Sequence, residues 1–196
     1  GAATQLKGAK KEILLRQSLD DKTTKMDDLA RAIKEAQIQV VISTLGDFQI
    51  IALLEALKNI NYTNLHLLGG DTIKTTLMLK GSGIIDGLYA TSPILDAHEF
   101  PAGAMFLEKY RNQFKVEPAY AGHYTYDAMH VLAAAIRRAE SAEPTKIVET
   151  LHLIDGYAPV TGSMKWTANG EQRYGVIGVY NTRNSVWESL VRSDNW

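Results

Sequence analysis

The chain has 196 residues, of which 45% are hydrophobic and 22% are charged, and its formal net charge is −1. This length allows one large domain or two small lobes, and the near-neutral charge lacks the basic excess of a nucleic-acid-binding domain. The sequence has no cysteine, which excludes disulfides and thiol chemistry, and no apolar run approaches the ~20 residues that span a membrane, so we expect no direct membrane insertion.

The first half of the chain predicts alternating helices and strands. Short apolar runs of the kind found in buried strands occur at residues 12–16, 39–43, 65–68 and 84–91. Apolar residues at helical spacing predict helices at residues 1–8, 26–36 and 48–59. Strands that alternate with helices are typical of parallel βαβ units, so we expect an α/β fold.

The second half predicts mainly helices, with no obvious strand between residues 101 and 153. Phe106, Tyr110 and Phe114 recur every four residues, which indicates an aromatic stripe in the core. Helices without strands between them cannot easily build a sheet-based core, so we expect them to expose apolar faces. Strands are predicted again near the end of the chain, at residues 162–166 before an Asn-Gly turn, at 174–180 and at 186–191.

Two of the predicted strands end in glycine and aspartate. The strand at 65–68 is followed by two glycines and Asp71, and the strand at 39–43 is followed by Thr44, Leu45 and a Gly46-Asp47 pair. Open α/β sheets bind ligands beyond the carboxyl ends of their strands, so we expect both loops to line one crevice. The candidate ligand-binding residues in these loops are Thr44, Gly46, Asp47, Phe48, Gly70 and Asp71.

Each aspartate also has a structural interpretation. Aspartate is a favoured helix N-cap, and a helix is predicted after each loop. For Asp47, which precedes the helix from Phe48, capping is favoured over ligand contact; for Asp71 both interpretations stay open. Two carboxylates in one crevice would favour a cationic or amine-bearing ligand.

The sequence contains no catalytic motif. It lacks a Walker loop, a dinucleotide glycine fingerprint, a serine elbow and a zinc-binding histidine pair. His123 and His130 are seven residues apart, which is not the spacing that brings two metal ligands together on a helix. We therefore expect no enzyme, no metal and no cofactor. A remote alternative is an enzyme in which Asp47 and Asp71 hold a magnesium ion, because carboxylates suit hard cations.

Taken in order, several segments resemble the substrate-binding proteins of branched-chain amino acid ABC transporters, the leucine/isoleucine/valine-binding family. These segments are residues 67–71, 87–93, 106–111 with Phe114, 124–129, and 162–166 through 170. The resemblance covers nearly the whole chain and about the last three-fifths of such a protein. It implies a type I periplasmic-binding-protein fold, with a parallel βαβ lobe and the helical remainder of a second lobe joined by hinge crossovers.

The resemblance also implies a division of the chain into parts. Residues 1–92 and 171–196 would form the α/β lobe, which is the second lobe of the family. Residues 93–170 would form the mainly helical part of the first lobe, without that lobe's N-terminal βα units.

The same resemblance assigns roles to the candidate site residues. Asp71 stands where the family places the acid that binds the ligand's ammonium group. Gly46 stands where the family commonly has an aromatic residue, and Phe48 lies two residues later, so a different side-chain specificity is expected. Tyr124 and Tyr126 would lie near the hinge, where they either line the cleft or pack against the rest of the first lobe.

The function implied is that of a solute-binding component of an ABC importer, which binds an amino acid or a similar small polar molecule between two lobes. Its partners would be this ligand and the membrane permease of the importer, and its location would be periplasmic or otherwise extracytoplasmic. Closure on the ligand would be the signal that the importer recognises. The alternative keeps the fold but makes it the ligand-sensing domain of a regulator or receptor.

Overall fold

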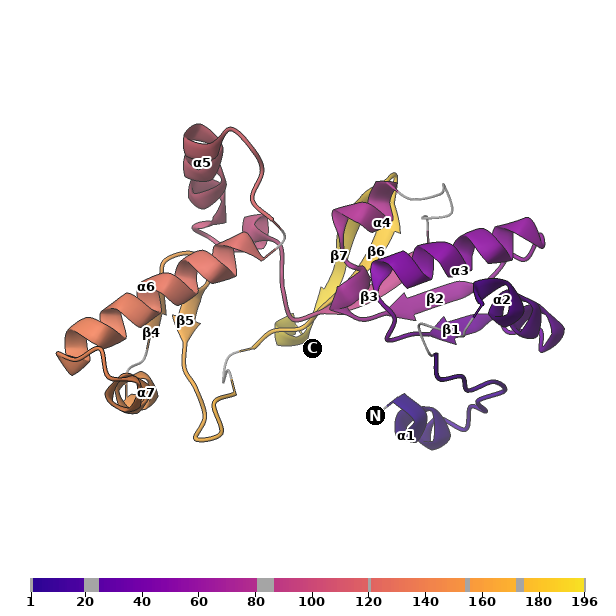
Figure 1. Cartoon of the computed structure of the whole chain (residues 1–196), viewed down its shortest axis with the longest axis horizontal. Coiled ribbons are helices and arrows are strands. Elements are labelled where there is room, and N and C mark those ends of the chain that lie inside the picture. Colours follow the sequence, from indigo (N-terminus) through magenta and orange to yellow (C-terminus); the bar gives the residue numbers. More distant parts are fainter. Residues whose placement is uncertain are drawn as a thin grey trace. The chain divides into compact units, whose positions relative to one another are not determined.

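The computed structural model describes residues 2–19, 25–80, 87–119, 121–153, 156–171 and 175–195. The chain forms two compact units, in which residues Gly1–Ser92 associate with Val179–Val191, and Pro93–Gly178 with Arg192–Trp196 (Figure 1). The architecture is mixed α/β, as the sequence predicts. No helix within the described ranges is both long and apolar enough to cross a membrane.

The first unit is built on a five-stranded sheet with the order β1-β2-β3-β6-β7. Strands β1, β2 and β3 are parallel, with Val41 opposite Leu67 and Leu67 opposite Leu88, as expected for βαβ units. The strands are β1 (Val40–Ile42), β2 (His66–Gly69), β3 (Leu88–Ser92), β6 (Gly178–Arg183) and β7 (Val186–Arg192). The helices are α1 (Ala2–Gly8), α2 (Met26–Glu35), α3 (Asp47–Asn59) and α4 (Thr76–Lys80).

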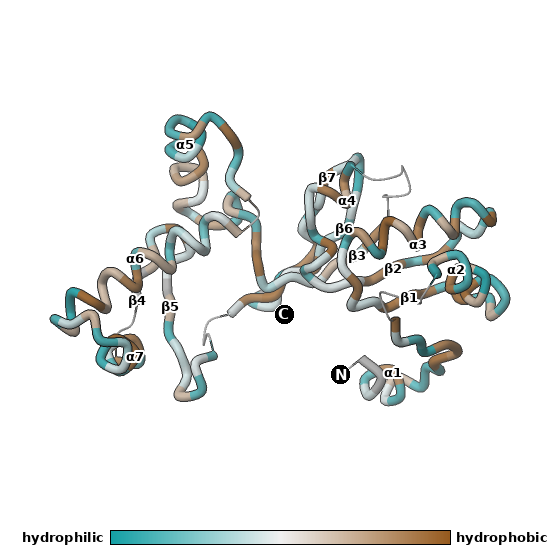
Figure 2. The backbone as a smooth tube through the Cα atoms, in the orientation of Figure 1, coloured by the Kyte–Doolittle hydropathy of each residue, from teal (hydrophilic) through white to brown (hydrophobic). Residues whose placement is uncertain are grey.

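Helix α3 is central to the core of this unit because it contributes to two apolar clusters. Ile50 and Leu54 pack with the sheet residue Leu67, whereas Leu53 and Leu57 pack against α2. Figure 1 shows α3 running along the parallel strands with α2 beside it, and Figure 2 shows hydrophobic stretches along β2 and α3. The spacing of three to four residues between these positions is that of helix faces turned toward a core.

A hairpin of β6 and β7 completes the described sheet. Its loop is Asn184-Ser185, and both residues have positive φ, 51° and 58°, as a two-residue type I′ turn requires. The hydroxyl of Thr182 accepts a hydrogen bond from the backbone N–H of Leu88 at 3.1 Å, which ties β6 to β3. Trp187 on β7 donates its indole N–H to the carbonyl of Thr75 at 3.1 Å.

The structure corrects the predicted bounds of these last strands. The sequence predicts a strand at 174–180, whereas β6 begins at Gly178 and continues to Arg183. Residues 172–174 lie outside the described residues. Asn181 and Thr182 belong to the strand because the hairpin pairing continues through them and Thr182 bonds to Leu88, which outweighs the turn preference of Asn181.

The strand predicted at residues 12–16 is wrong. This segment has no regular secondary structure, and Ile13 and Leu14 are 44% and 62% exposed. A strand needs a neighbour to pair with, and within the described residues none of the five sheet strands pairs with this segment.

The second unit contains three helices, α5 (Gly103–Phe114), α6 (Gly122–Ala139) and α7 (Pro144–Leu153). Two short antiparallel strands follow, β4 (Gly156–Ala158) and β5 (Gly162–Met164), of which only β5 falls in a predicted strand. The aromatic stripe is only partly core, since Phe106 is buried but Phe114 is 54% exposed. On α6 and α7, Met129 and Leu153 are 62% and 78% exposed, as expected for helices without a covering sheet.

A buried carboxylate fixes the strands of this unit to α6. Asp127 is fully buried, and its oxygens accept hydrogen bonds from the backbone N–H groups of Val160 and Thr161 and from the Thr161 hydroxyl, at 2.9, 2.7 and 2.7 Å. The carboxylate therefore satisfies the backbone donors of the turn between β4 and β5.

We expect Asp127→Ala to lower the free energy of unfolding by about 3 kcal/mol, because it leaves buried backbone donors without acceptors. Glu108→Ala is the control, since Glu108 is an exposed acid on α5, and its effect should stay within about 0.5 kcal/mol. Urea denaturation followed by circular dichroism measures both. Equal effects of the two substitutions would contradict the structural role of Asp127.

Candidate functional site

The carboxyl ends of β1 and β2 meet at one edge of the sheet. The backbone N–H of Ser43 donates to the carbonyl of Leu68 at 2.9 Å, immediately before the two loops begin. Across the loops, the Thr72 hydroxyl donates to the carbonyl of Leu45 at 3.0 Å. The structure therefore brings together the two loops that hold the candidate residues from Thr44 to Phe48 and from Gly70 to Asp71.

Both carboxylate oxygens of Asp47 are used within the protein. One accepts the backbone N–H of Phe48 and the other accepts the hydroxyl of Thr75, each at 2.8 Å. Asp47 is the first residue of α3, and the N-cap is Gly46, whose N–H donates to the Gln49 side chain at 3.1 Å. Asp47 thus satisfies a donor at the helix start, as the capping interpretation predicts, but from one position inside the helix.

Asp71 has different surroundings. It begins a short 3₁₀ segment, Asp71–Ile73, and does not cap a longer helix. The N-terminus of α4 is capped by Thr75, whose hydroxyl oxygen accepts the N–H of Met78 at 3.3 Å, so the capping interpretation of Asp71 is wrong. The Asp71 side chain is half-buried, and its carboxylate makes no hydrogen bond within the part of the chain that the structure describes.

The two neighbouring glycines have separate roles. A Cβ on the buried Gly69 would lie 2.4 Å from the Cδ1 atom of Ile73, which is itself fully buried, so glycine is needed there for packing. A Cβ on Gly70 would meet nothing within 4 Å, and its φ of −87° suits any residue. Neither packing nor backbone geometry requires glycine at position 70, which leaves open space in front of the backbone there.

The remaining loop residues are open to solvent. Phe48 is 75% exposed, and Thr44 is exposed at the end of β1. A Cβ on Gly46 would meet only the Gln49 side-chain oxygen, at 3.9 Å. The loop thus has room for a ligand but contributes no buried aromatic wall.

Tyr124 and Tyr126 lie on α6 in the second unit. The Tyr124 hydroxyl donates to the carbonyl of Pro93 and accepts the N–H of Leu95, both at 3.4 Å, so it ties α6 to the segment that follows β3. Burial raises the pKa of this phenol, although the bond from Leu95 opposes the shift. Tyr126 is 42% exposed and its ring centroid lies 5.4 Å from that of Phe106.

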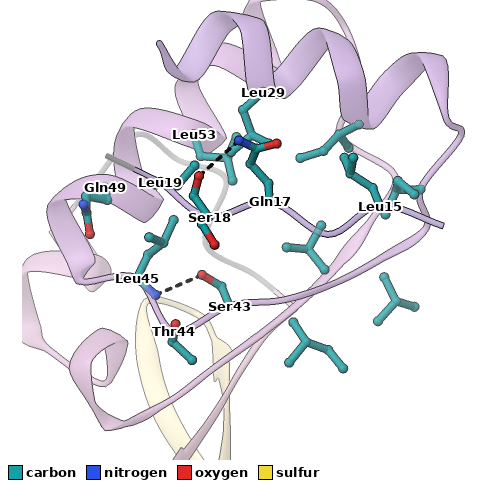
Figure 3. Close-up of a pocket in the computed structure, with 15 residues that line it drawn as sticks. Leu15, Gln17, Ser18, Leu19, Leu29, Ser43, Thr44, Leu45, Gln49 and Leu53 are labelled. Atoms are coloured by element: carbon teal, nitrogen blue, oxygen red, sulfur yellow. Dashed lines mark hydrogen bonds between the residues drawn. The ribbon is translucent and has the colours of Figure 1, made fainter. Parts of the chain in front are cut away.

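A groove of about 440 Å³ lies beside β1 (Figure 3). Of the candidate site residues only Thr44 lines it, so this groove is mainly separate from the space in front of Gly70 and Asp71. The lining residues are Leu15, Gln17, Ser18, Leu19, Leu29, Ile33, Ile38, Val40, Val41, Ile42, Ser43, Thr44, Leu45, Gln49 and Leu53.

The described residues hold no group of three or more acidic or histidine side chains that could bind a metal ion. The magnesium alternative would use Asp47 and Asp71 as ligands, and two carboxylates are fewer than the three side chains of such a group. Thr72 and Thr75 were not among the sequence candidates, although they position both loops. The signal that could have found Thr75 is a hydroxyl residue three positions before Met78, at the start of a helix.

Comparison with known proteins gives a consistent result for the fold. A sequence model of the family described as "Periplasmic binding protein" matches residues 1–181. No curated protein sequence matches the chain.

Three solved structures illustrate the similarity. A leucine binding protein from Thermotoga maritima is 20% identical, with a TM-score of 0.77 over 93% of this chain and 53% of that one. A solute binding protein of an ABC transporter from R. palustris, in complex with benzoate, is 11% identical, with a TM-score of 0.79 over 96% of this chain and 52% of that one. A branched chain amino acid ABC transporter periplasmic ligand-binding protein from Burkholderia xenovorans is 13% identical, with a TM-score of 0.73 over 97% of this chain and 53% of that one. The chain therefore spans about half the length of these structures.

The packing role of Gly69 is tested by comparing alanine at the two glycines. Gly69→Ala should lower the free energy of unfolding by about 1–3 kcal/mol, because the added methyl group overlaps Ile73. Gly70→Ala should be neutral or stabilising by up to about 1 kcal/mol, since it restricts the unfolded chain without strain. Urea denaturation measures the stability of both variants. A Gly70→Ala variant less stable than Gly69→Ala would contradict the packing role of Gly69.

The link between the loops is tested with an isosteric substitution. Thr75→Val removes the bond to Asp47 and the cap of α4, and should cost about 1–2 kcal/mol of unfolding free energy. Thr76→Val is the matched control because Thr76 is exposed. If both variants unfold at the same urea concentration, the Thr75 hydroxyl does not hold the loops together.

Proposed function

This chain belongs to the periplasmic binding protein family, and on that premise we propose that it is part of the solute-binding component of an ABC importer. In this proposal, a small amine-bearing molecule such as an amino acid binds beyond the carboxyl ends of β1 and β2. The observation that carries the proposal is the half-buried carboxylate of Asp71, which stands at a strand end with no partner among the described residues.

The chemistry of the loops supports an amine-bearing ligand. A carboxylate without an internal partner offers a charge-assisted hydrogen bond, which is about twice as strong as a neutral one. Gly70 leaves the adjacent backbone uncovered, so a ligand can approach its peptide groups. Asp71 is preferred to Asp47 for this role in the proposal because each oxygen of Asp47 already accepts one bond, from Thr75 or Phe48.

The ligands named for two of the solved structures differ in the charge that they would present to Asp71. Leucine carries an ammonium group, whereas benzoate has only a carboxylate, which the negative charge of Asp71 would repel. The proposal therefore favours the amino acid class over aromatic acids.

The same proposal includes two properties of the full-length protein. Its partner would be the membrane permease of an importer, and its location would be extracytoplasmic.

The proposal is tested by titrating the longest natural form of the protein with L-leucine, L-isoleucine, L-valine and benzoate in a calorimeter. Asp71→Asn should weaken binding of the amino acid by roughly 10- to 100-fold, because the charged acceptor for the ammonium group is lost. Asp27→Asn is the matched control, since Asp27 is an exposed aspartate on α2. The Asp27→Asn variant should bind the amino acid as tightly as the unmodified protein does.

Two results would contradict this assignment. Tighter binding of benzoate than of any amino acid would reject the amine-bearing class. An unchanged affinity in Asp71→Asn would show that the carboxylate does not contact the ligand. Binding of an amino acid without any acceleration of its uptake by a reconstituted permease would instead favour the sensing alternative.

A further inference from the structure

The loop that begins at Asp71 is held by two residues of the β6–β7 hairpin. The ammonium of Lys74 lies over the ring of Tyr180, on β6, at 3.9 Å from the ring centroid. The next residue, Thr75, accepts the indole N–H of Trp187, on β7, through its carbonyl at 3.1 Å. Two consecutive residues of the loop are therefore tied to a hairpin that comes from the end of the chain.

Lys74 is buried, which is uncommon for a lysine. Its exposed fraction is 4% and that of Tyr180 is 0%, and no other lysine or arginine of the described ranges is buried to this extent. Removing an ammonium group from water is unfavourable, and a contact with an aromatic face offsets this only in part. A methionine side chain would fill the space without burying a charge, so packing alone does not account for a lysine at this position.

The backbone connects Lys74 directly to Asp71. The N–H of Lys74 donates to the carbonyl of Asp71 at 3.0 Å, and Ile73 between them is fully buried. The loop is also bonded in the direction of β1, through the Thr72 hydroxyl and the carbonyl of Leu45. In the order of the sheet, β1 lies on one side of β2 and the β6–β7 hairpin lies on the other, beyond β3. The loop is thus held from both sides.

We propose that Lys74 is a positioning residue of the ligand site. Its ammonium, placed on the ring of Tyr180, holds the loop from Asp71 to Thr75 and so keeps the Asp71 carboxylate in place for the ligand's ammonium group. Lys74 does not itself touch the ligand. A loop that is already ordered loses less conformational entropy when a ligand binds, so this contact raises the affinity. This inference rests on the function proposed above.

The first test measures affinity and stability together, in the longest natural form of the protein. Lys74→Met removes the charge and keeps the length of the side chain. It should weaken the binding of L-leucine, measured by calorimetry, by about 3- to 30-fold, because the contact with Tyr180 is lost. The urea midpoint should stay equal or rise, because no charge remains buried. Lys80→Met is the matched control, since Lys80 is an exposed lysine on α4, and neither quantity should change.

Substitutions of the ring test the contact from its other partner. Tyr180→Phe keeps an aromatic face for the ammonium of Lys74, so it should bind L-leucine as tightly as the unmodified protein does. Tyr180→Leu removes that face and should weaken binding as much as Lys74→Met does. The double variant should bind no more weakly than either single variant, because both remove the same contact.

Hydrogen–deuterium exchange in the absence of ligand measures the order of the loop directly. In Lys74→Met, the amides of residue 74 and Thr75 should exchange about 10-fold faster than in the unmodified protein, because the loop opens locally. The amide of Ile50 is the internal control. It donates to the carbonyl of Gly46 at 3.0 Å, at the start of α3, and its rate should not change.

The positioning role is rejected by unchanged exchange of the loop amides in Lys74→Met, or by an unchanged affinity for L-leucine. A lower urea midpoint together with faster exchange at Ile50 would assign Lys74 a general structural role instead. Failure of the proposed function gives a different result, in which the unmodified protein binds none of the amino acids or Asp71→Asn has no effect. The exchange rates then still decide whether Lys74 holds the loop.

Discussion

The packing of α3 against β2 is the interaction on which the first unit depends. One face of the helix, with Ile50 and Leu54, covers the parallel strands, and another, with Leu53 and Leu57, holds α2. Because the helix is fixed on two sides, its N-terminus is fixed as well. That N-terminus carries Gly46 and Asp47 to the end of β1, beside the loop that follows β2.

This arrangement gives different surroundings to residues that look equivalent in the sequence. Asp47 and Asp71 both follow a strand and a glycine, but the carboxylate of Asp47 accepts bonds from Thr75 and Phe48, whereas that of Asp71 makes no hydrogen bond within the described residues. Among the glycines, Gly69 is required by the buried Ile73, whereas Gly70 faces open space. The chemistry proposed for the site therefore depends on the hydrogen bonds of two threonines, Thr72 and Thr75.

Each unit also leaves apolar surface uncovered within the residues described. In the first unit it is the edge of β1, where Val40 is 58% exposed, and in the second it is a face of α6 and α7, where Met129 and Leu153 are 62% and 78% exposed. The presence of this surface agrees with a chain that spans about half the length of the structures it matches.

The sequence by itself determined the α/β class and the parallel βαβ units, because hydrophobic periodicity is a local signal. The resemblance of several segments, taken in order, identified the family. The sequence also placed Asp47 and Asp71 in two adjacent loops, since parallel strands end at the same edge. Only the tertiary structure decided which of the two carboxylates is hydrogen-bonded within the protein, because Thr75, the partner of Asp47, lies 28 residues away along the chain. The prediction of a strand at residues 12–16 was wrong for the same reason. A strand needs a second strand to pair with, and the residues of the segment alone do not determine whether one lies beside it.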